Sequence, residues 1–236
     1  MGDTVQIIPN DVNANMRDIL DQELRTATSA ALSVAFITES GLNTILENLE
    51  GISYRGGEVR VLTGLYQAIT DSNSLRRMND AQGKYGDKFL ARISLEQQFH
   101  QKLYVIRSKP LDRTTIIIGS SNLTAGGLKS GGELNIMIKT RIGSALARKI
   151  DSIFGEEWAR GVKLSDDLIS NYDQWYKDLR KYALKMPGDK EIGNNPILDR
   201  ILGVASFHRD CEGIHYASQH KKSAGRRRSW RRKKQM

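Results

Sequence analysis

Two short motifs carry side chains that suit attack on a phosphodiester. His100 and Lys102 are separated by one residue at the start of a strand pattern, so period-two alternation sends both to the same face. Further on, a buried apolar run leads into the sequence GSSN at 119–122, a tight turn whose N–H groups and polar side chains can face an oxyanion. Glu133 begins the next strand pattern. A neutral His can attack phosphorus, a carboxylate can orient its ring, and Lys102 with Asn122 can carry the developing charge.

Each motif alone is common in proteins without catalytic function, but their joint appearance in this order favours a catalytic site. We expect Ser120 to support the turn and its hydrogen bonds. Two interpretations are open for the Ser121 hydroxyl: it contacts the scissile phosphate, or it bonds the turn's own backbone. Arg107 and Lys109 are candidates to steer phosphates toward the site, although a solvated face of a strand and loop explains them equally well.

Hydrophobic periodicity predicts the elements that position these residues. Continuous small and β-branched runs indicate buried strands, and apolar residues at spacings of three and four indicate helices. We expect strands at 30–37, 58–64, 89–95, 103–107, 114–119 and 133–139, and helices at 14–28, from Ser40 onward, at 74–82, at 141–158 and at 165–184. Strands that alternate with helices predict an α/β sandwich around a mixed sheet.

The pattern also divides the chain. We predict a catalytic domain over residues 1–160, a helical extension over 161–207 and a basic, disordered tail over 208–236.

The net charge of +9 belongs to the tail rather than to the domain. Residues 221–236 hold nine Lys and Arg residues and no acid, which leaves 27 basic and 27 acidic residues in the rest of the chain. Nonspecific attraction to nucleic acid is the leading interpretation of the tail, with nuclear import, an acidic membrane surface and simple solubility as alternatives. The tail residues expected to bind nucleic acid are Arg226, Arg227, Arg228, Arg231 and Arg232.

Composition excludes several other classes of protein. The chain has 236 residues, of which 39% are hydrophobic, so it can build a core. It has no run of about 18 apolar residues and no secretory pattern at its start, so we expect a soluble, cytoplasmic protein without a membrane. Cys211, the single cysteine, forms no internal disulfide, and its loose spacing from His208 and His215 makes a weak zinc site, so we expect neither a metal nor a cofactor.

The order H-x-K, G-S-x-N and Glu resembles the phospholipase D superfamily, and FHQKLY, GSSNLTAGGL and ELNIMI resemble its nuclease branch, found in metal-independent restriction endonucleases and defence-associated helicases. The resemblance covers roughly residues 5–180 and implies a phospholipase D-like α/β/α sandwich. The superfamily's motif has Asp where this chain has Arg107. Because the nuclease branch often lacks that Asp, we expect Arg107 to weaken a lipase interpretation rather than to abolish activity, and we expect Glu133 to orient His100.

In this superfamily two such motifs meet at one site, where one His becomes attached to the phosphate and the other protonates the leaving oxygen and then activates water, without a metal. This chain has one complete motif, because His220-Lys221-Lys222 lacks a strand and a following G-S-x-N. We therefore expect a homodimer in which each protomer supplies its own His100 to one shared site.

These features predict a metal-independent endonuclease that hydrolyses DNA, with RNA as the other substrate, through a phosphohistidine intermediate in restriction or defence. The chain has no module recognisable as a reader of base sequence, so a helicase or specificity subunit is an expected partner. The alternatives are a nucleic-acid-binding subunit that does not cleave and a phospholipid phosphodiesterase.

Overall fold

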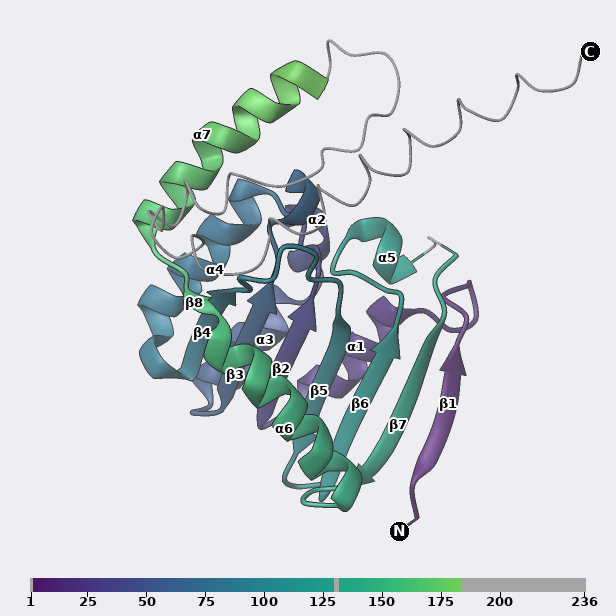
Figure 1. The fold of residues 1–236 in the computed structure, drawn as a ribbon. Helices are drawn as coiled ribbons and strands as arrows, with labels where there is room; N and C mark the ends of the chain where they lie inside the picture. Colours follow the sequence, from purple (N-terminus) through teal and green to yellow (C-terminus); the bar gives the residue numbers. More distant parts are fainter. Residues whose placement is uncertain (1, 130–131, 184–236) are drawn as a thin grey trace, which may run out of the picture.

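A mixed sheet runs through the computed structural model, which describes residues 2–129 and 132–183 (Figure 1). Within these residues the sheet has eight strands in the order β1-β7-β6-β5-β2-β3-β4-β8. The strands are β1 (Thr4–Ile8), β2 (Ser29–Val34), β3 (Glu58–Thr63), β4 (Phe89–Ile93), β5 (Lys102–Ser108), β6 (Arg113–Gly119), β7 (Asn135–Arg141) and β8 (Val162–Lys163). The α-helices are α1 (Met16–Arg25), α2 (Glu39–Leu42), α3 (Leu46–Tyr54), α4 (Ser72–Tyr85), α5 (Ala125–Lys129), α6 (Ala145–Arg160) and α7 (Asp166–Ala183).

The directions of the strands gather several loop ends at one edge of the sheet. Strands β2, β3 and β4 are parallel, β5 is antiparallel to β2, and β6 is antiparallel to β5. The carboxyl ends of β2 and β6 therefore lie beside the amino end of β5, with Lys102 opposite Val34 and Leu103 opposite Ile118. This edge holds both sequence motifs.

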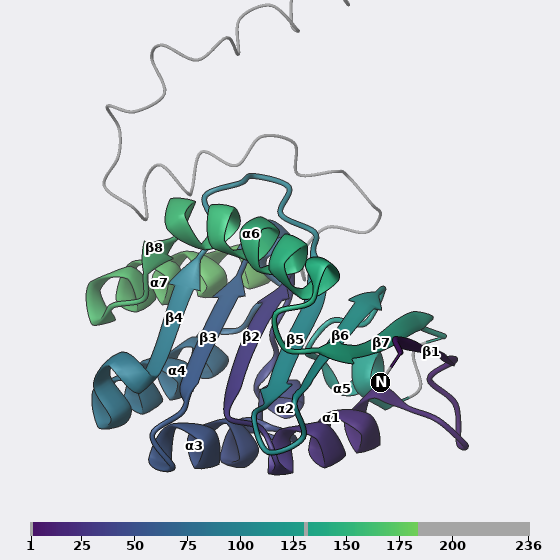
Figure 2. The same cartoon turned by 90° about the horizontal axis from the view of Figure 1, so that it is seen from below.

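Helices cover both faces of the sheet, as Figure 2 shows from below. Alternate residues of β5 explain this arrangement, because Tyr104 and Ile106 enter the core beneath α1, α3 and α4, whereas Leu103 and Val105 enter the core beneath α6. A strand buried on both faces needs the continuous apolar run that the sequence shows. The expected α/β sandwich around a mixed sheet is thereby confirmed.

The helix predicted from Ser40 onward is in fact two helices, α2 and α3. The Thr38 hydroxyl caps α2 by accepting from the Gly41 N–H, and the Thr44 hydroxyl donates to the Gly41 carbonyl at 2.6 Å, closing the turn. A Cβ at Gly41 would lie 2.2 Å from the Leu123 carbonyl oxygen. The break in the helix thus lets the backbone at Gly41 press against the segment that follows GSSN.

Residues 161–183 add to the same core as the preceding part of the chain. The short strand β8 extends the sheet beside β4, and the buried Tyr172 of α7 donates its hydroxyl hydrogen to the Thr70 carbonyl. Helix α6 buries Ile150, Phe154 and Trp158 on one side, whereas Ile153 is 38% exposed. Among the described residues, no helix combines the length and the apolar character needed to cross a membrane.

Candidate active site

His100 and Lys102 lie side by side where β5 begins. The Lys102 Nζ is 2.7 Å from Nδ1 and 3.1 Å from Nε2 of His100, and it donates to the His100 carbonyl oxygen at 3.0 Å. Lys102 is only 8% exposed, whereas His100 is exposed. The predicted pair is therefore present, with the imidazole open to a substrate and the ammonium behind it.

The pair shifts its own protonation equilibria. Burial and the neighbouring positive charge of Lys102 lower the pKa of His100 below its ordinary value. Burial also lowers the pKa of Lys102, an effect that the negative charge of Glu133 opposes without reversing it. A lowered imidazole pKa keeps His100 neutral, and therefore nucleophilic, near pH 7.

Phe36 contacts both His100 and Asn122. Its ring meets the His100 ring edge-on at 5.7 Å between centroids, and its backbone N–H donates to the Asn122 Oδ1 at 3.1 Å. The Asn122 carbonyl oxygen is thus already bonded, while its Nδ2 has no hydrogen-bond partner within the part of the chain that the structure describes. That Nδ2 is a donor free to bind an oxyanion at the same edge.

The serines of the turn have different surroundings. Ser121 is buried and exchanges two hydrogen bonds with Asn135: its N–H donates to Oδ1 at 3.2 Å, and its Oγ accepts from Nδ2 at 2.8 Å. The exposed Ser120 accepts the Leu134 N–H on its Oγ at 3.0 Å. Ser120 thus connects the turn to the residue before β7, and its supporting role stays a prediction. The Ser121 hydroxyl bonds the Asn135 side chain of β7 rather than the turn's own backbone.

Gly119 is required by the close approach of two strands. It pairs with Asn135, and a Cβ at this position would lie 2.3 Å from the Asn135 Oδ1 and 2.4 Å from the Leu134 carbonyl oxygen. The Asn135 side chain extends toward Ser121 and occupies the space that a larger residue at position 119 would need. The glycine of the turn and the asparagine of β7 therefore form one unit.

Glu133 lies close to the pair but is not bonded to the imidazole. Its negative charge acts on Lys102 and on the buried Tyr104, whose pKa is raised by burial and then by Glu133. Within the described residues Glu133 makes no hydrogen bond to His100, and the charged group that contacts the ring is Lys102. The orienting role of Glu133 stays a prediction.

Arg107 and Lys109 lie at the other end of β5. An extended strand rises about 3.3 Å per residue, so Arg107 is roughly 16 Å from Lys102. Arg107 forms an ion pair with Asp151 of α6, and the Lys109 backbone donates to the Thr28 hydroxyl. The structure thus separates both residues from His100 instead of bringing them to it. Arg226, Arg227, Arg228, Arg231 and Arg232 lie outside the described residues.

Sequence reasoning missed three residues that build the site: Phe36, Tyr104 and Asn135. Tyr104 donates its hydroxyl hydrogen to the Ser121 carbonyl at 3.0 Å and so ties β5 to the turn. Alternation along β5 places Tyr104 on the face of Lys102, and a lone Asn within the apolar run NIMI was a second available signal. No local signal pointed to Phe36.

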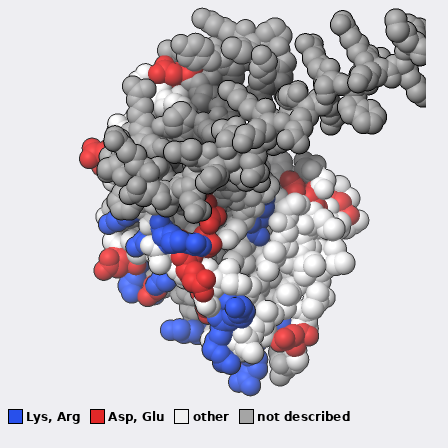
Figure 3. All heavy atoms as spheres, in the orientation of Figure 1, with Lys and Arg blue, Asp and Glu red and all other residues white. Residues whose placement is uncertain are grey.

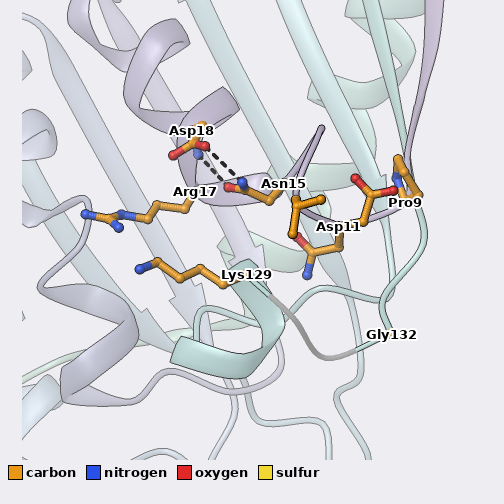
Figure 4. Close-up of a pocket in the computed structure, with 9 residues that line it drawn as sticks. Pro9, Asp11, Asn15, Arg17, Asp18, Lys129 and Gly132 are labelled. Atoms are coloured by element: carbon orange, nitrogen blue, oxygen red, sulfur yellow. Dashed lines mark hydrogen bonds between the residues drawn. The ribbon is translucent and has the colours of Figure 1, made fainter.

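A second polar feature lies at the amino end of α1, where residues of the β1–α1 loop, α1 and α5 line an open pocket of about 650 Å³. Figure 4 shows the side chains of Arg17 and Lys129 extending in the same direction along it. Neither forms an ion pair within the described residues, whereas Asp18 accepts a hydrogen bond from Asn15. The lining thus carries two cations, Arg17 and Lys129, together with two carboxylates, Asp11 and Asp18.

No group of three or more His, Cys, Asp or Glu side chains in residues 2–129 and 132–183 is arranged to hold a metal ion. At the β5 edge the structure places the imidazole of His100, the ammonium of Lys102 and the amide of Asn122. These groups suit nucleophilic attack with stabilisation of an oxyanion.

Comparisons with known proteins give a matching family and similar folds. The family model "Cardiolipin synthase, PLD-like domain" matches residues 20–158. The fold is similar to a phospholipase D family member, Nuc, from Salmonella typhimurium, at 17% identity and a TM-score of 0.53, over 69% of this chain and 98% of that chain. It is also similar to phosphatidylserine synthase from Haemophilus influenzae Rd KW20, at 14% identity and a TM-score of 0.57, over 78% of this chain and 46% of that chain. No curated protein matches the chain.

Proposed function

The chain belongs to the phospholipase D superfamily, and on this premise we propose that it is an endonuclease of the nuclease branch that hydrolyses DNA phosphodiester bonds without a metal. The observation that carries the proposal is the contact between Lys102 and the neutral, exposed His100, with the free amide of Asn122 at the same edge. Together they supply a nucleophile and two donors for phosphate oxygens.

In the proposed reaction an imidazole nitrogen of His100 attacks phosphorus and forms a P–N bond while the P–O bond to the leaving group breaks. The His100 of a second protomer gives its proton to the leaving oxygen. That second imidazole then takes a proton from water, whose oxygen attacks phosphorus and releases the first His100. Lys102 and Asn122 stabilise the charge on the phosphate oxygens in both steps.

DNA is preferred over phospholipid as the substrate because of the charge distribution. The tail carries nine positive charges. Such charges bind a polyanion with strong salt dependence. We place the activity in the cytoplasm, in restriction or defence, together with a helicase or specificity subunit.

The test is cleavage of plasmid DNA in excess EDTA, comparing the wild type with His100→Ala. We expect the wild type to cleave and His100→Ala to retain binding but lose cleavage by a factor of 10³ or more, on the order expected for loss of a nucleophile. The matched control is His220→Ala, which alters the other H-x-K sequence and should cleave as the wild type does.

Parallel assays distinguish the alternatives. Hydrolysis of phospholipid vesicles but not of DNA would favour a phospholipid phosphodiesterase. Cleavage of RNA but not of DNA would show that RNA is the substrate of the nuclease. DNA binding without any cleavage by the wild type would favour a non-cleaving subunit. An absolute requirement for Mg²⁺, or undiminished cleavage by His100→Ala, would contradict the mechanism.

A further inference from the structure

Two loops without a lysine or an arginine border the candidate active site. The β3–α4 loop (residues 64–70) follows β3, and the β4–β5 loop (residues 94–101) leads into His100. Their one acid, Glu96, forms an ion pair with Arg160 of α6. Both loops present uncharged side chains that can form hydrogen bonds, namely Tyr66, Gln67, Gln97 and Gln98.

Backbone hydrogen bonds place the β3–α4 loop beside His100. The Ala35 N–H donates to the Gln101 carbonyl oxygen at 2.8 Å, and the Gly64 N–H donates to the Ala35 carbonyl oxygen at 3.3 Å. Since neighbouring strands lie about 4.8 Å apart, the loop begins roughly 10 Å from Gln101, the residue after His100. A Cβ at Gly64 would lie 3.2 Å from the ring of Phe99, the residue before His100. Figure 1 shows the carboxyl ends of β2 and β3 and the start of β5 at the same edge of the sheet.

The β3–α4 loop is held in a strained conformation. Gln67 and Ala68 have φ values of 55° and 51°, in the left-handed region that residues other than glycine rarely adopt. The buried Thr70 fastens the loop, because its hydroxyl donates to the Gly64 carbonyl at 2.8 Å and accepts the Ile37 N–H at 3.2 Å. Backbone strain of this kind persists only where surrounding bonds enforce it, and it gathers at sites that bind ligands.

The polar side chains of the two loops are available to a ligand. Gln67, Gln97 and Gln98 are exposed, and Tyr66 is half-buried. Within residues 2–129 and 132–183 these four side chains form no hydrogen bond. The strained backbone thus holds an aromatic ring and a free amide at the edge where His100 lies.

These groups suit nucleobases better than phosphates. Phosphates are bound mainly by Lys and Arg, which both loops lack. An amide offers a donor and an acceptor to the edge of a base, and an aromatic ring stacks on its face. In the space-filling view, Lys and Arg side chains gather where α6 crosses the sheet and toward the other end of the strands (Figure 3).

We propose that the β3–α4 and β4–β5 loops bind the nucleobase of the nucleotide next to the scissile phosphate. Tyr66 stacks on the base, and the amides of Gln67, Gln97 and Gln98 bond its edge. The inference rests on the proposed function, because it is the phosphate at His100 that brings the adjoining base to these loops. It adds a contact with the bases to a site whose other groups act on the phosphate.

The experiment compares two fluorescent single-stranded DNA oligonucleotides of equal length, one with bases and one made of tetrahydrofuran abasic residues. Fluorescence anisotropy measures their binding to the full-length chain carrying His100→Ala, so that neither is cleaved. Both contain the same phosphates, so the ratio of the two dissociation constants isolates the contribution of the bases. We expect the oligonucleotide with bases to bind about tenfold more tightly or better, the effect of one stacked base.

Substitutions in the same background assign the contribution to the loops. Tyr66→Leu and Gln67→Ala should bring the ratio toward one, whereas Tyr66→Phe keeps the ring and should preserve most of it. The matched control is Gln6→Ala, which removes an exposed amide of β1 and should leave the ratio unchanged. Circular dichroism checks that each variant is folded.

Equal affinity for the two oligonucleotides would overturn the inference. A preference for bases that is the same in folded Tyr66→Leu and Gln67→Ala variants would also overturn it, because the bases would then bind elsewhere. Binding does not depend on cleavage, so a base preference that requires Tyr66 and Gln67 in a chain that never cleaves DNA would contradict only the proposed function. Cleavage by the wild type with no preference for bases would contradict only the inference.

Discussion

Lys102 lies 2.7 Å from a ring nitrogen of His100, and this contact influences which protonation state the imidazole adopts near neutral pH. Burial disfavours the cationic form of His100, and the ammonium beside it disfavours that form further. The two residues stand two positions apart in an extended segment, so their proximity is a local property of the chain.

We predict that the pKa of His100 is below the ordinary value of about 6.5 and rises when Lys102 is replaced by Met. Removing the neighbouring cation stabilises the protonated imidazole, so the shift is upward. In the wild type, kcat/KM should fall as the pH drops through the lowered pKa, because protonation removes the nucleophile. It should fall again at higher pH, as the second His100 loses the proton that it gives to the leaving oxygen. NMR titration of the imidazole, assigned with His100→Ala, measures the pKa directly. A downward shift in Lys102→Met would contradict this account.

A second prediction concerns Gly119 in the turn at 119–122, where a single added Cβ atom tests the packing. We predict that Gly119→Ala destabilises the fold by about 1–3 kcal/mol, because its Cβ overlaps the Asn135 Oδ1 and the Leu134 carbonyl. Displacement of Ser121 and Asn122 should reduce cleavage on the order of a hundredfold. The control is Gly126→Ala, where a Cβ meets nothing within 4 Å and stability should be unchanged or slightly higher. Equal effects of the two substitutions would show that packing at Gly119 is unimportant.

Helix α1 is joined to the sheet by a buried carboxylate. Glu23 is 3% exposed, accepts from Thr115 of β6 at 2.8 Å, and forms ion pairs at 2.8 Å with Arg113 of β6 and Lys139 of β7. Burial raises the pKa of Glu23, but the hydrogen bonds from Lys139 and Thr115 and the nearby positive charges outweigh burial and hold the pKa below its ordinary value. The charged form is therefore the one that stabilises the fold.

We predict that Glu23→Gln lowers the free energy of unfolding by about 2 kcal/mol at pH 7. Because the folded pKa is lowered, the contribution of Glu23 is complete above the unfolded carboxyl pKa of about 4.3 and disappears as the pH falls through the folded value. Urea denaturation at pH 7 and at successively lower pH should show the two proteins converging. Glu58→Gln, which removes the exposed pair with Arg60, should cost less than about 0.5 kcal/mol. A constant difference at all pH values would exclude Glu23 as the titrating group.

Most elements follow from their own sequences, and the exceptions arise from contacts with distant residues. The strands β2 to β7 and the helices α1, α4, α6 and α7 agree with the hydrophobic pattern. Periodicity did not predict β8, a strand of two residues that pairs with β4, or α5, a single short helix rich in glycine. The break between α2 and α3 depends on the approach of Leu123 to Gly41. Such elements are too short to show a period of their own.

Charge is distributed unevenly over the chain, with all of the net +9 in residues 221–236. We predict that deleting these residues weakens DNA binding and makes it less dependent on salt. In a plot of the logarithm of the binding constant against the logarithm of the salt concentration, the slope should become shallower by up to about 0.9 for each tail cation that contacts a phosphate. Cleavage at saturating DNA should persist, because the chemical groups lie at the β5 edge. A tail of equal length made of Gly and Ser is the control for length. Loss of cleavage at saturation would mean that the tail takes part in the chemical step.

The amino-acid sequence by itself determined the chemistry that depends on neighbours along the chain. Alternation along an extended segment places His100 beside Lys102, and GSSN after a buried strand makes a turn. These relations hold in any fold that contains the strands, so they were predictable.

The contacts of these groups depended instead on the strand order β1-β7-β6-β5-β2, which no local pattern specifies. That order brings Asn135 to Ser121 and Phe36 to Asn122 and His100, and it directs the charge of Glu133 toward Lys102. It also carries Arg107 to the far end of β5. The physical reason is that strand order and helix cover are set by the burial of apolar surface throughout the molecule, and this includes residues far apart in the chain.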